Sequence, residues 1–195
     1  IDKNGNRGIS SSGTLEINNS TIANNGDQGI YSRGTIEITN STISDNGRRG
    51  VDSSGITKIT DTKIINNNSQ GIRVSSNTAN IINSTIDGNS DNGIIATGNT
   101  NIINSTVSNN SNSGINNDGW NNLVSITNST ISGNSGSTGG GILNESGTVI
   151  INNSTITDNE ATGGQGSGIA NRGNLVQIGN SIVAGNRNTD IDFTG

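Results

Sequence analysis

A two-residue pattern, glycine followed by isoleucine or valine, recurs along the whole chain of 195 residues. Successive glycines of this pattern are 21, 21, 21, 22, 21, 27 and 27 residues apart. A period of this length is typical of a solenoid, in which each repeat buries its apolar face against the next repeat. The eight pairs are Gly8-Ile9, Gly29-Ile30, Gly50-Val51, Gly71-Ile72, Gly93-Ile94, Gly114-Ile115, Gly141-Ile142 and Gly168-Ile169.

Each repeat contains two further segments in which apolar and polar residues alternate. In the first repeat these segments are Leu15-x-Ile17 and Asn19-Ser20-Thr21-Ile22. In the last repeat the second segment has changed to Asn180-Ser181-Ile182-Val183. Short alternation in residues that are poor helix formers predicts strands. We therefore expect an all-β fold, a right-handed parallel β-helix (solenoid) of about eight coils with three short strands per coil, stacked at about 4.8 Å.

An asparagine stands three residues after the last apolar position of every repeat. Its amide can bond a turn backbone, tolerate a left-handed conformation and pass hydrogen bonds to the next coil. We expect a buried ladder here, and we expect the glycine of each Gly-Ile pair to supply a positive φ at a sharp turn. The ladder residues are Asn25, Asn46, Asn67, Asn89, Asn110, Asn134, Asn159 and Asn186.

Side-chain alternation also sorts the remaining strand positions into inward and outward columns. The recurring Ile and Val residues are expected to point inward and to stack on their equivalents in neighbouring coils. Outward charged residues one repeat apart are expected to pair, with each exposed pair contributing about 0.2–1 kcal/mol. One such column holds Glu16, Glu37 and Lys58, and another holds Tyr31, Asp52 and Arg73.

Composition narrows the classes of partner. A net charge of −5, with no basic stretch along the sequence denser than Arg48-Arg49, predicts that nucleic acids and anionic membranes are not partners. The apolar runs are all far shorter than the roughly 20 residues that a membrane helix needs, so no membrane insertion is expected. The chain starts at Ile1 without a methionine, and we expect residues 1–195 to be one repeat domain of a larger protein.

The repeat unit carries a family resemblance. Gly-Ile, then Thr-Leu/Val-x-Ile-x-Asn-Ser-Thr-Ile, then x-x-Asn resembles the pectate-lyase-like β-helix repeats of large bacterial secreted and cell-surface proteins, including the polymorphic outer-membrane protein repeat. The resemblance covers nearly the whole chain, and Asn180 to Asn186 are similar to the final coils of such arrays. It implies an extracellular or cell-surface location, and it specifies the fold better than the activity.

Catalytic and metal-binding candidates are sparse. The chain has no histidine, which excludes His-based acid/base and triad chemistry, and no catalytic residue or cofactor is assigned. Asp190 and Asp192 are weak calcium candidates, whereas Gly163 to Ser167 lacks the Asp of a calcium repeat and is expected to be a flexible loop. The acidic residues nearest the longer repeats are Asp118, Glu145, Asp158, Glu160, Asp190 and Asp192.

Two surface features suggest ligands. Trp120, the only tryptophan, is the best single anchor for a sugar, although a loop that covers the rod is the simpler role for it. The second feature is an outward threonine column that resembles the surface of ice-binding β-solenoids, with Lys63, Asp87 and Ile182 interrupting the rows. The column comprises Thr21, Thr42, Thr85, Thr106, Thr130 and Thr155.

The function expected from these patterns is a non-catalytic structural or adhesive module, not an enzyme. The first alternative is a carbohydrate-binding or carbohydrate-active β-helix that contacts cell-surface polysaccharide near Trp120, and the second is ice binding. Neither end shows an evident cap for its strand edges. We therefore expect flanking domains or other protein chains at the ends, including end-to-end assembly into filaments.

Overall fold

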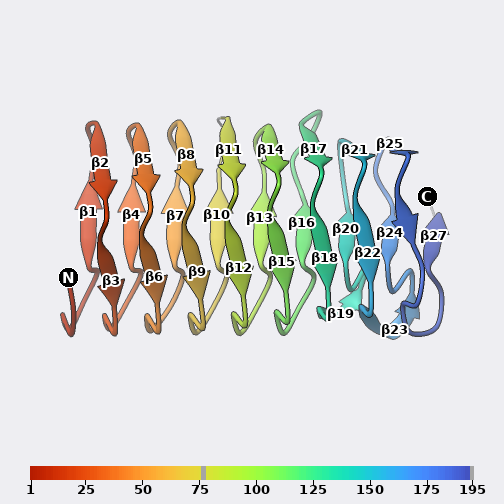
Figure 1. Cartoon of the computed structure of the whole chain (residues 1–195), viewed down its shortest axis with the longest axis horizontal. Helices are drawn as coiled ribbons and strands as arrows, with labels where there is room; N and C mark the ends of the chain where they lie inside the picture. The colour runs from red at the N-terminus through yellow and green to blue at the C-terminus, as the bar shows by residue number, and fades with distance from the viewer. Residues whose placement is uncertain (76–77, 194–195) are drawn as a thin grey trace.

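The computed structural model is a rod built from stacked coils, with the two chain termini at opposite ends (Figure 1). It describes residues 1–75 and 78–193. Strands and turns make up these residues, and they contain no helix, hence none that could cross a membrane. Eight coils at the spacing of β-strands give a rod about 40 Å long.

Three parallel sheets run along the rod, as the repeat pattern predicts. Sheet I contains β1 (Ile9–Ser11), β4 (Ile30–Ser32), β7 (Val51–Ser53), β10 (Ile72–Val74), β13 (Ile94–Ala96), β16 (Ile115–Asn117), β20 (Ile142–Asn144), β24 (Ile169–Asn171) and β27 (Ile191–Phe193). Sheet II contains β2 (Leu15–Asn18), β5 (Ile36–Thr39), β8 (Thr57–Thr60), β11 (Ala79–Ile82), β14 (Thr100–Ile103), β17 (Leu123–Thr127), β21 (Thr148–Asn152) and β25 (Leu175–Gly179). Sheet III contains β3 (Thr21–Ala23), β6 (Thr42–Ser44), β9 (Lys63–Ile65), β12 (Thr85–Asp87), β15 (Thr106–Ser108), β18 (Thr130–Ser132), β22 (Thr155–Thr157) and β26 (Ile182–Val183).

The core follows the predicted inward columns. Ile30 of sheet I pairs with Val51 in the next coil, Ile38 of sheet II pairs with Ile59, and the same strict register continues along each sheet. These residues and their equivalents in the inner coils are fully buried in one continuous cluster, and the equivalents in the end coils, such as Ile9 and Ile178, are partly buried against it. The interior is therefore a set of parallel Ile and Val stacks, which explains how so few apolar residues suffice for a core.

The glycine column has a different role from the predicted one. Its members are absent from the positive-φ glycines, so the expectation of a left-handed turn at these positions is wrong. A Cβ added at Gly71 would lie 2.7 Å from the carbonyl oxygen of Gly93, 2.7 Å from the Ile86 side chain and 2.8 Å from the Asn89 amide. Glycine is required here because the chain passes too close to the next coil for any side chain.

Asparagine and aspartate supply the left-handed residues instead, but not at the ladder positions. The first residue of each Asn-Ser-Thr-type segment, from Asn19 to Asn180, has a φ of 47° to 51° and turns the chain from sheet II to sheet III. The residue before each ladder asparagine, such as Asn24 or Asp45, also has a positive φ. Asn and Asp tolerate this conformation better than other side chains, which accounts for their recurrence at both corners.

The longer coils near the C-terminus add a small fourth sheet. It pairs β19 (Ser135–Thr138) with β23 (Glu160–Gln165) at the corner between sheets III and I, visible at the lower right of Figure 1. The register of this pair shifts between Gly136 and Thr138. The expectation of a flexible loop at Gly163 to Ser167 is thus wrong for Gly163 to Gln165, because backbone pairing with the preceding coil makes them part of a strand.

Candidate functional site

The asparagine ladder is confirmed and runs without a break through the rod. Each ladder amide donates from Nδ2 to the Oδ1 of the next ladder residue, at 2.9 Å from Asn25 to Asn46 and 3.0 Å from Asn89 to Asn110. The same Oδ1 also accepts the backbone N–H of the preceding ladder residue, as Asn110 does from Asn89 at 3.0 Å. The ladder residues are buried, so each coil is tied to the next through a dry chain of amides.

The ladder extends one residue beyond the predicted set at each end. Asn4 donates to Asn25 Oδ1 at 2.9 Å, and Asn186 donates to Asp190 Oδ1 at 2.8 Å. Asp190 Oδ1 also accepts the backbone N–H of Asn186. The structure therefore uses one oxygen of this calcium candidate to end the ladder. The described residues contain no group of three acidic, histidine or cysteine side chains that could hold a metal ion, and calcium binding at Asp190 and Asp192 stays a prediction.

A second buried ladder, which the sequence analysis missed, comes from the middle residue of the Asn-Ser-Thr segments. The backbone N–H of each member donates to the hydroxyl of the next, for example from Ser84 to Ser105 at 3.1 Å. Each hydroxyl in turn donates to the carbonyl two residues earlier, as Ser84 does to Ile82 at 2.8 Å. The signal was present in the sequence, because this position holds only Ser or Thr. The members are Ser20, Ser41, Thr62, Ser84, Ser105, Ser129, Ser154 and Ser181.

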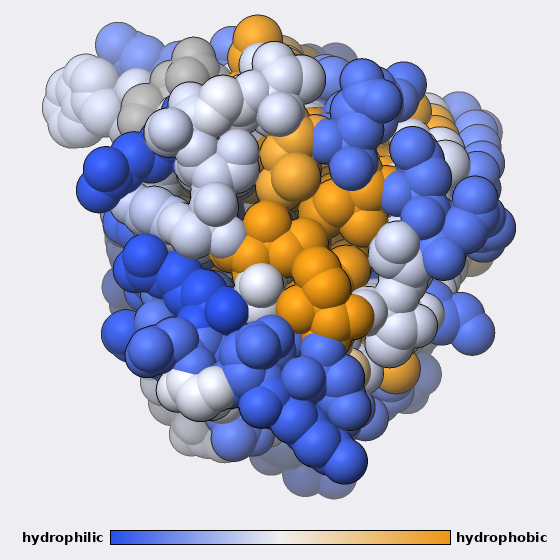
Figure 2. All heavy atoms as spheres, turned by 90° about the vertical axis from the view of Figure 1, so that its left-hand side faces the viewer, coloured by the Kyte–Doolittle hydropathy of each residue, from blue (hydrophilic) through white to orange (hydrophobic). Residues whose placement is uncertain are grey.

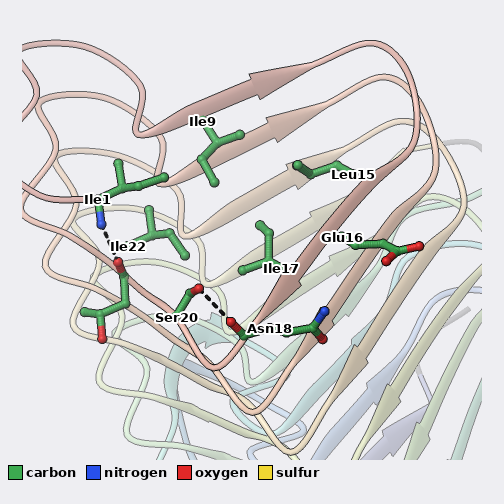
Figure 3. Close-up of a pocket in the computed structure, with 9 residues that line it drawn as sticks. Ile1, Ile9, Leu15, Glu16, Ile17, Asn18, Ser20 and Ile22 are labelled. Atoms are coloured by element: carbon green, nitrogen blue, oxygen red, sulfur yellow. Dashed lines mark hydrogen bonds between the residues drawn. The ribbon is translucent and has the colours of Figure 1, made fainter.

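The N-terminal end of the rod exposes its apolar interior. Figure 2 faces this end and shows hydrophobic residues at its centre inside a hydrophilic rim. A cavity of about 370 Å³ opens there, and Figure 3 shows Ile9, Leu15, Ile17 and Ile22 around it with Ile1 at its edge. β1 and β2 are the end strands of sheets I and II, so their outer edges carry no further strand among the described residues.

The third sheet is partly covered at this end by the chain itself. The amino group of Ile1 donates to the Thr21 carbonyl at 2.7 Å, and the Ala23 N–H donates to the Ile1 carbonyl at 2.9 Å. Asp2 forms a parallel bridge with Ala23. The open part of the end is therefore the place beside β2 that a strand occupies in every later coil.

The C-terminal end also leaves apolar side chains exposed. Leu175 of β25, Ile182 of β26 and Phe193 of β27 are all exposed, and these three strands end their sheets. The other exposed large apolar residues of the described surface are Ile1 at the N-terminal end and Ile56, Trp120 and Leu123 along the rod.

The candidate carboxylates are dispersed along the rod and paired with arginines where they approach other charges. Arg172 lies 3.2 Å from Glu145, and Arg187 lies 3.0 Å from Glu160, each joining successive coils. Asp158 accepts a hydrogen bond from the adjacent Thr157 hydroxyl. The structure thus places Glu145 and Glu160 in exposed ion pairs rather than bringing the candidate acids together.

Trp120 does not cover the rod. Its side chain is 87% exposed and projects from the turn between β16 and β17. Beside it lies an open polar cavity of about 360 Å³ lined by Thr78, Thr97, Gly98, Asn99, Asn121 and Asn122. The expected role as a loop cover is wrong, because the turn lifts the indole away from the coil instead of folding it over the sheet.

The predicted outward columns are in register. Glu37 pairs with Lys58 at 2.6 Å, and Arg73 approaches Asp52 at 3.8 Å. The threonines form one row along sheet III with Lys63 and Ile182 in the same row. The parallel row two residues later is less uniform, since Ala23, Ser44 and Ser108 are buried. Ice binding stays a prediction of the sequence.

Comparison with known proteins agrees with this geometry. A family model described as a right handed beta helix region matches residues 1–103 and 50–195, which together span the chain. No curated protein and no solved structure matches the chain significantly.

Proposed function

The chain belongs to the family of right-handed β-helix regions, which includes enzymes and non-enzymes, and from this premise we propose that it is a non-catalytic structural module. In this role the rod acts on the outside of a cell as a rigid spacer between the protein segments at its two ends, or presents those segments to partners. Its location on a bacterial surface is part of the same proposal and is supported by the repeat resemblance.

The continuity of the internal ladders carries this proposal. Successive coils are joined by backbone hydrogen bonds in three sheets, by the amide ladder, which is buried from Asn25 to Asn186, and by the hydroxyl ladder, which is buried from Ser41 to Ser154. Bending the rod would break bonds inside a dry interior, where an unmade hydrogen bond costs about 1–3 kcal/mol. Such a solenoid transmits distance and orientation between its ends.

The exposed strand edges at the ends support contact with further β-strands. A strand added beside β2 would complete the cavity lined by Leu15, Ile17 and Ile22 and pair with an open backbone edge. Flanking chain and a second copy of this chain are both able to supply such strands, and the second leads to end-to-end filaments.

The spacer role is tested by a distance measurement between spin labels. Glu16→Cys and Gln177→Cys create two sites in the same outward column seven coils apart, in a chain with no native cysteine. We expect a narrow distance distribution centred near about 34 Å. Deleting residues 30–71, which removes two coils in register, should shorten it by about 10 Å. A broad distribution, or an unchanged distance after the deletion, would overturn the proposal.

The absence of catalysis is tested separately. Incubation with polygalacturonate, xylan and chitin, followed by measurement of new reducing ends and unsaturated products, should show no turnover. Reproducible turnover that scales with protein concentration would assign the chain to the enzymes of the family instead.

A second candidate function is the binding of a neutral sugar at Trp120. It is favoured by the 87% exposure of the indole beside a polar cavity, since aromatic faces stack on sugar rings while amides bond their hydroxyls. Because the chain has a single tryptophan, its fluorescence reports directly on this site. Titration with xylo- and cello-oligosaccharides should shift the emission, and Trp120→Ala should abolish retention on the matching resin. No shift with any sugar would exclude this candidate.

A further inference from the structure

Five arginines gather on one corner of the rod, although they are spread over 66 positions of the sequence. They come from the first four coils and lie on sheet I or on the turns at its two sides, with Arg33 in the turn that leaves the sheet. The sequence shows only Arg48-Arg49 as a basic pair, so the stacking of coils is what assembles the group. We call Arg7, Arg33, Arg48, Arg49 and Arg73 the arginine cluster.

The N-terminal part of the cluster is held together by a tyrosine and a carboxylate. The Arg7 guanidinium stacks 4.2 Å from the centre of the Tyr31 ring, and Arg33 donates to the Tyr31 hydroxyl at 2.9 Å. Arg7 and Arg48 approach opposite oxygens of Asp27, each at 3.6 Å. Three guanidinium groups from three successive coils therefore surround Asp27 and Tyr31 of the second coil.

The C-terminal part repeats this arrangement around a more deeply buried carboxylate. Arg49 lies 3.0 Å from Asp52 Oδ2, and Arg73 lies 3.8 Å from Asp52 Oδ1. Asp52 stands directly beside Tyr31 in the register of sheet I, so the two parts are continuous. Arg49 is further oriented by its Nε donating to Gln70 at 2.7 Å.

Three of the arginines are more exposed than the carboxylates that they approach. Side-chain exposure is 40% for Arg7 and Arg73 and 59% for Arg48, against 9% for Asp52 and 25% for Asp27, whereas Arg49 is 21% exposed. Five cations against two carboxylates leave a local net charge of +3. A ligand that arrives from solvent therefore meets mainly guanidinium groups.

The cluster ends where the surface becomes acidic. Asp91 follows Arg48 in the same turn column two coils later, and it accepts hydrogen bonds from Gln70 and Asn112. Beyond Arg73 the chain has eight acidic residues and only two basic ones, Arg172 and Arg187, and both of these pair with glutamates. The positive surface is therefore confined to a stretch of about four coils.

We propose that the arginine cluster binds an acidic glycan chain lying along the rod axis, through carboxylate or sulfate groups. Guanidinium forks match these planar or tetrahedral oxyanions, and the five arginines are spread over four successive coils along the rod axis. A nucleic acid fits less well, because Arg7 covers one face of Tyr31, the only aromatic ring in the cluster, so that this face is not free to stack on a base. This inference does not depend on the spacer role or on Trp120.

The test uses the full chain, with a second double variant of the same chain as the matched control. Binding of dextran sulfate, polygalacturonate and uncharged dextran is measured by isothermal titration calorimetry at low and physiological salt. We expect one or both acidic glycans to bind and uncharged dextran to be inert. The double variant Arg33→Gln/Arg73→Gln removes two exposed cluster cations and should weaken binding by about tenfold or more. Arg172→Gln/Arg187→Gln makes the same change in net charge elsewhere and should leave binding within about twofold.

Each other outcome has a defined meaning. Preference for dextran sulfate over polygalacturonate, or the reverse, identifies sulfate or carboxylate as the group recognised. No binding by either, or equal loss in the two double variants, overturns the proposal, since only net charge would then matter. Tighter binding of single- or double-stranded DNA than of both glycans would also overturn it. Circular dichroism spectra that match the parent chain show that both variants remain folded.

Discussion

The early coils and the last two coils build the same rod in different ways. In the early coils the repeat is 21 or 22 residues, and the sheet I strands end in residues without an amide side chain, with Ser32, Ser53, Val74 and Ala96 buried in one column. In the last coils the repeat is 27 residues, and the same column carries Asn117, Asn144 and Asn171, which form a short ladder at 2.7 and 2.6 Å.

The difference shows which part of a coil tolerates change. The number of residues between the last inward residue of sheet II and the inward residue of sheet III stays the same along the rod. It is the same from Ile17 to Ile22 in the first coil as from Ile151 to Ile156 near the C-terminus. Added residues lie only in the two turns that flank sheet I, where they build the β19–β23 pair and the turn of Trp120. Ladders and apolar stacks set a constant cross-section, and variation collects at corners where no ladder bond is lost.

The largest expected contrast comes from adding one methyl group in each region. Gly71→Ala forces a Cβ to within 2.7 Å of a backbone carbonyl in the next coil and should destabilise the chain by about 3 kcal/mol or more. Gly164→Ala in β23 meets nothing within 4 Å and strains only a positive φ, at a cost of about 1 kcal/mol. Urea unfolding followed by circular dichroism measures both. Similar costs would contradict the close-approach role of the glycine column.

The next contrast concerns the ladder. Asn89→Ala removes side-chain hydrogen bonds to buried groups of the two neighbouring coils and should lower the free energy of unfolding by about 1–3 kcal/mol. Asn186→Ala should cost less, because Asn186 is 9% exposed and water can reach the groups that it leaves. If the two variants have equal midpoints in chemical denaturation, the ladder asparagines of the inner and the outer coils contribute equally to stability.

Hydrogen exchange should separate the regions without any substitution. The β19–β23 pair has two strands and an irregular register, whereas β9 lies between β6 and β12. Amides of the pair should exchange about tenfold faster than those of β9, equivalent to about 1.4 kcal/mol in opening free energy. Mass spectrometry of peptides covering 135–138, 160–165 and 63–65 supplies the comparison, and equal protection would mean that the added sheet is as stable as the rod.

The smallest effect is expected from surface charge. The Glu37–Lys58 pair is about half exposed, and a double-mutant cycle to alanine should give a coupling of about 0.2–1 kcal/mol that decreases with salt. Glu145–Arg172 is the matched pair in the last coils, with slightly lower exposure. A coupling above about 2 kcal/mol in either pair would show that exposed columns contribute more to the rod than its burial pattern implies.

The sequence period predicted the three strands and the inward columns of each coil, because the same residue types recur at the same positions of successive coils. An inward Ile at one position, as at Ile43, implies an inward residue one period later at Ile64, and both ladder partners and charge columns follow by the same count. The role of Gly71 could not be predicted from the sequence. A recurring glycine is consistent either with a positive φ or with a backbone that passes too close to the next coil for a side chain.

Structural features that depend on residues from several columns of the repeat could also not be predicted from single motifs. The hydroxyl ladder through Ser84 was visible as a Ser-or-Thr position, but its burial depends on the corner geometry that Asn83 creates. The arginine cluster required the distance between turn and sheet columns, which sequence spacing does not contain. The β19–β23 pair lies in the residues that break the period, where counting fails.

The amide ladder gives the rod a direction. Every ladder amide from Asn4 to Asn186 donates to the next ladder residue toward the C-terminal end, so their dipoles align head to tail with the hydrogen-rich pole at Asn186. The carboxylate of Asp190 sits at that pole, as an acid does at the N-terminus of a helix. The opposite pole, at Asn4, presents an acceptor. A strand that extends the series at Asn4 must therefore bring a donor. At the other end Asp190 already supplies the acceptor, so a second rod can continue the ladder head to tail only if its first ladder amide replaces this carboxylate.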